Sequence, residues 1–72
     1  MENKNRLTYR VSAALAGEIL SQKMPIGAKL PSDTDLCEKF QVSRTVLREA
    51  LRVLGAKGLI TAKPRVGTLV AE

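Results

Sequence analysis

Hydrophobic residues at spacings of three and four along the first third of the chain predict an amphipathic helix. They are Leu7, Val11, Ala14, Leu15 and Ile19. The pattern covers residues 7–22 and stops ahead of Pro25, a residue type that cannot continue a helix. Residues 1–6 are mostly polar or charged, and they predict a flexible N-terminal tail.

A break rich in proline and glycine separates this helix from the next one. Residues 24–31 include Pro25, Gly27 and Pro31, which predicts a turn and a brief extended piece. Ser32 then supplies a side-chain oxygen that can cap the free backbone N–H groups at a helix N-terminus. We therefore expect a short second helix to begin after Ser32.

Ser43 marks the start of a third helix in the same way. This helix is predicted over residues 44–57, and Gly58 is well placed to adopt the left-handed conformation that ends many helices. The segments that follow, 59–62 and 68–71, are rich in branched residues and favour β-strands.

The segment between these two strands, 63–67, predicts the rigid and basic tip of a β-hairpin. The order of elements is then helix, short extended piece, helix, helix and hairpin, which is that of a winged helix-turn-helix. The predicted fold class is therefore α+β, with three helices and a two-stranded β-hairpin wing. We expect residues 7–72 to form this single domain.

The composition excludes several classes of function. The 72 residues include no histidine and one cysteine, so His-based catalysis and Cys/His metal sites have no residues to use. We therefore expect a protein that is not an enzyme and that holds neither metal nor cofactor. The unpaired cysteine suits a reducing compartment, and no segment approaches the roughly 18 apolar residues of a membrane span. We expect a cytoplasmic location without membrane association.

The positive charge is concentrated in one part of the chain. The net charge is +5, yet residues 39–65 alone hold seven basic residues against one acidic residue, Glu49, and carry +6. Within the predicted third helix, Arg44, Arg48 and Arg52 recur every four residues, opposite a leucine-rich face. Ordinary solvated helices mix charges of both signs, whereas this arc contains no acid. The pattern indicates a surface for a polyanion, with double-stranded DNA as the partner.

These residue types match the chemistry that recognition of DNA requires. We expect Arg44, Thr45 and Arg48 to contact base edges in the major groove, because a guanidinium can donate two parallel hydrogen bonds to guanine. Phosphates are expected to bind the hydroxyl and guanidinium groups of Ser32, Ser43 and Arg52. The first role of both serines is interpreted as helix capping.

The predicted hairpin tip offers a second contact with DNA. Lys63 and Arg65 place positive charge there, a proline stiffens the turn, and Gly67 allows a tight backbone. The wing, residues 63–67 including Val66, is therefore expected in the minor groove or on flanking phosphates. Arg65 is the stronger candidate for the minor groove.

Longer motifs resemble those of a known family. They are Pro25-x-Gly27-x-x-Leu30-Pro31-Ser32-Asp33, Val42-Ser43-Arg44-Thr45-x-x-Arg48-Glu49-Ala50-Leu51, Gly58-Leu59-Ile60 and Gly67-Thr68-x-Val70. They cover nearly all of the chain after residue 6 and resemble the DNA-binding domain of GntR-type bacterial transcription regulators. The resemblance implies a dimeric regulator on a short pseudo-palindromic operator. It also implies recognition-helix contacts by Arg44, Thr45 and Arg48 and a phosphate-binding cap at Ser43.

Two positions depart from the family pattern. Many members carry arginine between the two acids at the start of the second helix, where this sequence has Thr34. We keep Thr34 as a phosphate contact, weaker than that arginine or directed to a different target. The family's wing commonly has a Gly-x-Gly tip, of which only Gly67 is kept here. The tip is similar to that of the FadR-like branch, whose effector domains are all-helical.

The resemblance also leaves alternatives open. Family members carry a C-terminal effector-binding and dimerising domain, so these 72 residues are expected to be part of a longer chain and need not dimerise alone. Repression by blocking polymerase is the simplest mechanism, with activation as the alternative. The runner-up function is a winged-helix module for protein–protein contact, which predicts an exposed apolar patch or a neutral third helix, and the sequence shows neither. RNA binding by the same face lacks stacking aromatic residues.

Overall fold

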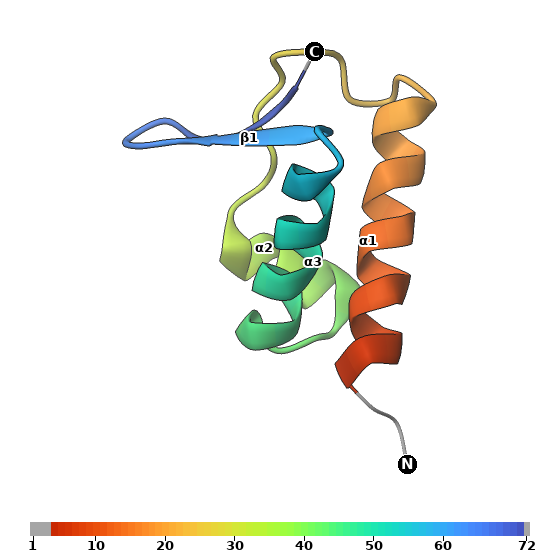
Figure 1. Cartoon of the computed structure of the whole chain (residues 1–72). Coiled ribbons are helices and arrows are strands. Elements are labelled where there is room, and N and C mark those ends of the chain that lie inside the picture. The colour runs from red at the N-terminus through yellow and green to blue at the C-terminus, as the bar shows by residue number, and fades with distance from the viewer. Residues whose placement is uncertain (1–3, 72) are drawn as a thin grey trace.

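Three helices and a β-hairpin make up the fold, as the sequence predicted. The computed structural model describes residues 4–71 of the chain. The elements, in chain order, are α1 (Lys4–Leu20), α2 (Asp33–Phe40), α3 (Arg44–Ala56), β1 (Ile60–Lys63) and β2 (Gly67–Val70) (Figure 1). α1 packs along α3, and the hairpin projects from the helices on the side opposite α1 (Figure 1).

α1 extends further toward the N-terminus than its hydrophobic stripe. It begins at Lys4, so residues 4–6 are helical and the predicted tail of residues 1–6 is wrong at these positions. Residues 1–3 of that tail lie outside the described residues. None of residues 4–6 breaks a helix, and extending an existing helix forms one hydrogen bond for each residue added. The helix ends at Leu20, before the expected residue 22, because Gln22 adopts a left-handed φ of 67°.

Serine caps begin both of the shorter helices, which confirms the predicted starts. Oγ of Ser32 and Oγ of Ser43 each accept a hydrogen bond from the backbone N–H three residues later, at 3.1 and 3.2 Å. Each bond satisfies one N–H group that has no partner within its helix. α3 ends at Ala56, one residue earlier than predicted, and Gly58 adopts the expected left-handed φ, at 77°.

The hairpin is antiparallel and gains a third, very short partner. β1 pairs with β2 in a register that places Lys63 opposite Gly67, so each strand is shifted by one residue from its predicted range. The extended piece predicted between the two prolines lies along the other edge of β2. There the N–H of Leu30 donates to the carbonyl of Thr68 at 2.8 Å. The base of the wing is therefore built from two distant parts of the chain.

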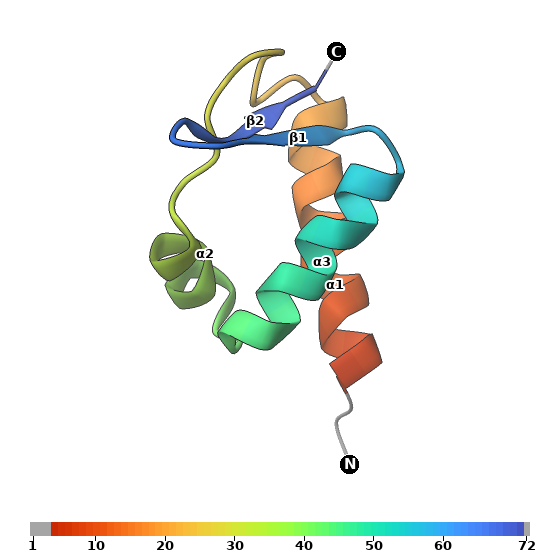
Figure 2. The same cartoon turned by 60° about the vertical axis from the view of Figure 1, so that its left-hand side comes forward.

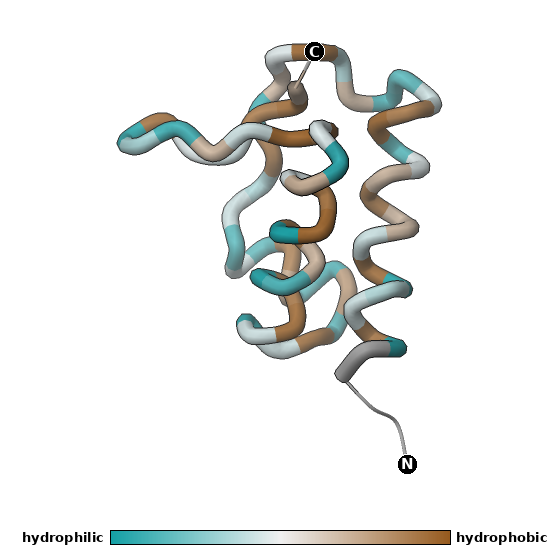
Figure 3. The backbone as a smooth tube through the Cα atoms, in the orientation of Figure 1, coloured by the Kyte–Doolittle hydropathy of each residue, from teal (hydrophilic) through white to brown (hydrophobic). Residues whose placement is uncertain are grey.

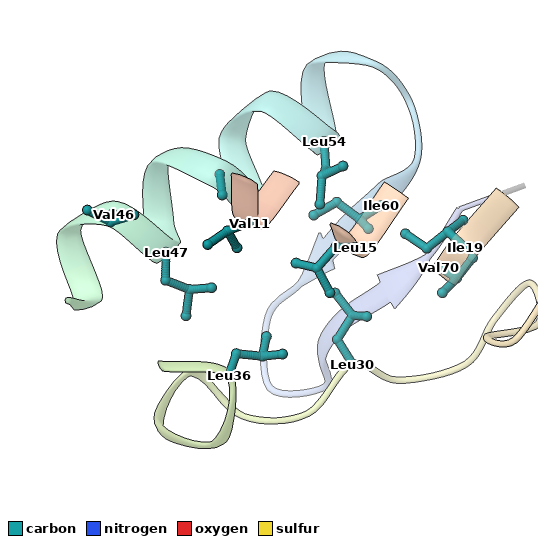
Figure 4. Packing of buried hydrophobic residues seen from close by; sticks show 11 residues of the cluster. Val11, Leu15, Ile19, Leu30, Leu36, Val46, Leu47, Leu54, Ile60 and Val70 are labelled. Atoms are coloured by element: carbon teal, nitrogen blue, oxygen red, sulfur yellow. The ribbon is translucent and has the colours of Figure 1, made fainter. Parts of the chain in front are cut away.

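An aliphatic core joins the three helices to the base of the hairpin. Leu15 of α1, Leu36 of α2 and Leu47 of α3 are almost completely buried and point toward one another (Figure 4). Ile60 and Val70 close the core under the hairpin. Hydrophobic and hydrophilic residues alternate along α1 and α3 (Figure 3), and the buried residues of each helix lie on one face. Burial of each such leucine contributes about 1.5–3 kcal/mol.

Polar contacts attach the end of α2 to α1. Nη2 of Arg10 donates to the carbonyl of Phe40 at 3.1 Å, which satisfies one of the free carbonyls at the helix end. Nζ of Lys39 lies 3.2 Å from Oε2 of Glu18 and 5.5 Å from the centroid of the Phe40 ring. Lys39, counted in the basic segment of the sequence, therefore belongs to this helix contact.

Candidate nucleic-acid interface

The exposed arc of α3 carries the side chains that the sequence predicted for it. Arg44, Thr45, Arg48 and Arg52 are all exposed. The opposite face is buried in the core through Val46, Leu47, Ala50 and Leu54. Rotating α3 about its axis would expose these apolar residues, so the packing of the core holds the arc outward. Among the described residues, none of the three arginines forms an ion pair, and their charge remains available to an anion.

Arg44 is held toward the start of α2. Its Nη2 atom donates a hydrogen bond of 3.4 Å to Oγ1 of Thr34. Both side chains are exposed, so this pair lies on the surface where the first turns of α2 and α3 approach each other. The structure thus brings Thr34 beside the leading candidate for a base contact, a proximity that their separation in the sequence does not reveal.

Ser32 and Ser43 lie at the N-termini of the same two helices. Their Oγ atoms act as caps, but both side chains are exposed and each hydroxyl keeps a proton of its own. That proton can be donated to an oxygen acceptor such as a phosphate. The predicted pair of roles, cap and anion contact, is therefore chemically compatible at both positions.

A groove of about 480 Å³ lies between α3 and the hairpin. It is lined by Asp33, Arg48, Leu51, Arg52, Gly55, Ile60, Ala62 and Thr68. Asp33 is the one acid in this lining and is half-buried. A carboxylate beside Arg48 and Arg52 repels phosphate, so it limits where along the groove a nucleic-acid backbone can pass.

The hairpin tip presents its charge from a strained turn. The N–H of Val66 donates to the carbonyl of Lys63 at 3.1 Å and closes the turn. Arg65 adopts a φ of 67°, a conformation that costs a residue with a side chain about 1–2 kcal/mol. Gly67 has a φ of 121°, which agrees with the tight backbone predicted there. Residues 63–67 are exposed throughout, on a wing that projects past the helices in Figure 1 and lies above α2 in the turned view of Figure 2.

Lys29 is a further cation at this surface, and its position there was not predicted from the sequence. It forms a bridge with Leu69 on the open edge of β2, and its aliphatic stem lies against Gly67. The one signal in the sequence was its position inside the predicted extended piece. The strand that this piece joins is far along the chain, and no local pattern identifies it.

Comparison with known proteins agrees with this architecture. The model of a family described as bacterial regulatory proteins, gntR family, matches residues 7–70. The chain belongs to this family. The galactonate operon transcriptional repressor of Escherichia coli K12 is 41% identical over 64 residues, covering 89% of this chain and 28% of the repressor. A fatty acid metabolism regulator of Haemophilus influenzae is 40% identical over 67 residues, covering 85% of this chain and 28% of that regulator.

Solved structures of similar proteins share the fold. The DNA-binding domain of AraR in complex with operator ORR3 superposes with a TM-score of 0.86 at 29% identity, covering 90% of this chain and 78% of that one. A GntR protein of Streptococcus agalactiae gives a TM-score of 0.80 at 31% identity, covering 90% of this chain and 32% of the other. These matches confirm the winged helix-turn-helix, and they identify a domain of regulatory proteins and not an enzyme.

The GntR-family domain spans less than a third of the curated relatives it matches. Its share is 29% of the HTH-type transcriptional regulator YieP of E. coli K12, which is 42% identical over 67 residues covering 93% of this chain. In the part of the chain that the structure describes, no helix has the length and apolar character needed to cross a membrane.

Proposed function

We propose that this GntR-family domain binds double-stranded DNA in a sequence-specific manner, as the reader domain of a bacterial transcriptional regulator. The recognition helix, residues 44–57, lies in the major groove. The wing, residues 63–67, enters the minor groove or follows the flanking phosphates. The observation that carries the proposal is the arc of exposed arginines on α3, which project from a helix whose other face is buried.

The base contacts are assigned to the first half of α3. Arg44 donates two parallel hydrogen bonds to a guanine, while Thr45 and Arg48 contact neighbouring base edges. The residues around them bind phosphates and set the position of the helix in the groove; they are Ser32, Thr34, Ser43 and Arg52. Arg52 lies further from the N-terminus of α3 and reaches only the backbone.

The wing supplies contacts outside the major groove. Lys63 and Arg65 bring positive charge to the tip, where a narrow minor groove has its strongest negative potential. The exposed side chain of Val66, with 47% of its surface accessible, gives the tip an apolar contact for sugar or base edges. Gly67 allows the tight backbone with which β2 leaves the turn.

The regulator is proposed to act as a homodimer on a pseudo-palindromic operator, with each reader domain on one half-site. Repression is the expected outcome, and the galactonate operon transcriptional repressor among the relatives supports it. The relatives are also more than three times as long as this domain, which leaves room in the full regulator for effector binding and dimerisation. A regulator of bacterial promoters acts in the cytoplasm.

The test begins with selection of the preferred operator from random duplex DNA. Titration of that operator with Arg44→Ala is expected to show a loss of about 1–3 kcal/mol and a relaxed preference at one base pair. Unchanged discrimination by Arg44→Ala would exclude base recognition by Arg44. Binding of the unmodified chain to random duplex should also weaken steeply as salt increases, because several phosphate contacts release counterions.

Thr34 provides a finer version of the same test. Removing its hydroxyl in Thr34→Val leaves the Arg44 guanidinium without its acceptor, and we expect a smaller loss of preference at the same base pair. Thr34→Ser keeps the acceptor and should preserve the preference. If Thr34→Val instead loses affinity equally for the operator and for random duplex, Thr34 is assigned to a phosphate contact alone.

Protein contact is a second candidate function, favoured by an apolar groove at the other end of α3. The groove has a volume of about 490 Å³, and Leu20 and Ile26 in its lining are 70% and 68% exposed. An exposed apolar patch of this kind was the feature that this alternative predicted. Replacing both residues with serine should leave operator affinity unchanged. A loss of affinity would link this groove to DNA binding.

A further inference from the structure

The extended piece at residues 28–30 is part of the wing. The N–H of Leu30 donates to the carbonyl of Thr68, and the N–H of Val70 donates to the carbonyl of Ala28, at 2.8 and 2.9 Å. Lys29 lies between these two bonds and forms an antiparallel bridge with Leu69. Its backbone is therefore fixed at the edge of β2, close to the start of the projecting tip.

The side chain of Lys29 runs across the sheet toward Gly67. Its Cε atom is 2.9 Å from the position that a Cβ on Gly67 would occupy, and its Cγ and Cδ atoms are each 3.8 Å away. Any larger residue at position 67 would displace this side chain. Lys29 is exposed, and within the described residues its ammonium has neither a hydrogen bond nor an ion pair.

The register of the hairpin brings a second lysine to the same place. Lys63 is directly opposite Gly67, and directly opposed residues point to the same face of a sheet. Lys29 therefore approaches Gly67 from one side and Lys63 from the other, on one face of the wing. Asp33 lies in the groove with Ala62 and Thr68, a pair that points to the opposite face. Within the residues that the structure describes, neither of the two lysines forms an ion pair with a carboxylate.

Two lysines that flank a residue without a side chain can hold a compact anion between them. Their mutual repulsion is relieved when an anion binds between them. Because Gly67 has no Cβ, the stem of Lys29 can lie against its backbone, and Lys29 remains exposed at the surface. When the domain binds DNA, the anion available at this position is a phosphate of the duplex backbone.

We propose that Lys29 and Lys63, on either side of Gly67, form a phosphate-binding site on the outer face of the wing. The site holds a backbone phosphate beside the minor groove that the tip enters. This inference rests on the proposed DNA binding and adds to it a site that does not depend on base sequence. The pairing of residues 28–30 with β2 places the first of the two lysines.

Lys29→Met tests the site, because methionine keeps most of the aliphatic stem against Gly67 and removes the charge. We expect affinity to fall about three- to ten-fold, equally for the selected operator and for random duplex. The slope of log affinity against log salt should fall by about 1. Base preference should stay unchanged, and Lys29→Arg should restore both affinity and slope. The circular dichroism unfolding curve of each variant verifies that it is folded.

Lys23→Met is the matched control, since it removes the same charge from an exposed residue in the turn after α1. Wild-type affinity and slope in Lys23→Met, with losses in Lys29→Met, support the site. Equal losses in the two variants would attribute the effect to net charge and overturn the proposal, as would an unchanged Lys29→Met. If the unmodified chain fails to discriminate its selected operator from random duplex, the proposed function fails, whereas the salt slopes on random duplex still test Lys29.

The double variant Lys29→Met/Lys63→Met tests whether the two lysines share one phosphate. Its loss of affinity should be smaller than the product of the two single losses, because either change already weakens the same contact. A loss equal to that product would show two independent contacts and overturn the shared site.

Discussion

The recognition helix and the wing both present cations to solvent, but they hold them in different ways. α3 has a row of buried residues behind its basic arc and a serine cap at its start. The hairpin is buried only at Ile60 and Val70, and its tip is exposed. The arc is thus oriented by core packing, whereas the tip is oriented by strand register and by the backbone conformation of one turn.

This difference separates stability from binding in the two regions. A change behind the arc of α3 alters the core and therefore the fold of the whole domain. A change at the tip of the wing alters few contacts within the protein, so its main effect is on the affinity for DNA. Substitutions in each region test this distinction when both the free energy of unfolding and the affinity for DNA are measured.

Leu47→Ala should have the largest effect. Leu47 is completely buried beneath the arc, and its truncation should lower the free energy of unfolding by about 2–5 kcal/mol. For a domain of 72 residues this removes much of the total stability, and DNA binding should be lost with it. Urea denaturation followed by circular dichroism measures the change. Leu20→Ala, at a site that is 70% exposed, is the control and should change stability by less than about 0.5 kcal/mol.

Arg65→Gly should show the reverse pattern at the wing. Glycine relieves the strain of the positive φ at this position, but it also gains conformational freedom in the unfolded chain, and the two effects nearly cancel. We expect stability to change by less than about 0.5 kcal/mol, while affinity falls about three- to ten-fold, most strongly with A·T-rich flanks. Affinity is measured by fluorescence anisotropy on operators with different flanks. Wild-type affinity on all of them would exclude a minor-groove role for Arg65.

Gly55→Ala should have the smallest effect, because it changes only the helix propensity of one residue in α3. A Cβ at Gly55 or at Gly17 would meet no atom within 4 Å, so alanine at either position should raise stability by about 0.5 kcal/mol through helix propensity. Gly17→Ala lies on α1 and serves as the control for binding. We expect both variants to keep wild-type operator affinity. A loss confined to Gly55→Ala would show that the DNA backbone contacts the last turn of α3, in the groove beside Arg52.

Most of the fold was predictable because its signals are local. The hydrophobic stripe of α1, the caps Ser32 and Ser43 and the left-handed Gly58 each act within a few residues of one another. The errors arose where a local signal was weak. Residues 4–6 carry no hydrophobic pattern and were assigned to the tail, yet they continue α1.

The candidate site was predictable to a smaller extent. The spacing of Arg44, Arg48 and Arg52 was enough to place them on one face of a helix. The sequence could not show that Arg44 contacts Thr34, since that depends on how α2 packs against α3. The attachment of Lys29 to the wing was equally hidden.

The sequence by itself determined the order of the elements, the aliphatic core, the basic arc of α3 and the charged tip of the wing. Each of these depends on periodicity, capping or turn chemistry between residues that are close along the chain. The tertiary structure alone decided that Lys39 pairs with Glu18, and that Lys29 joins Lys63 beside Gly67. The physical reason is that side chains distant in sequence meet only after the core has fixed the relative positions of their backbones.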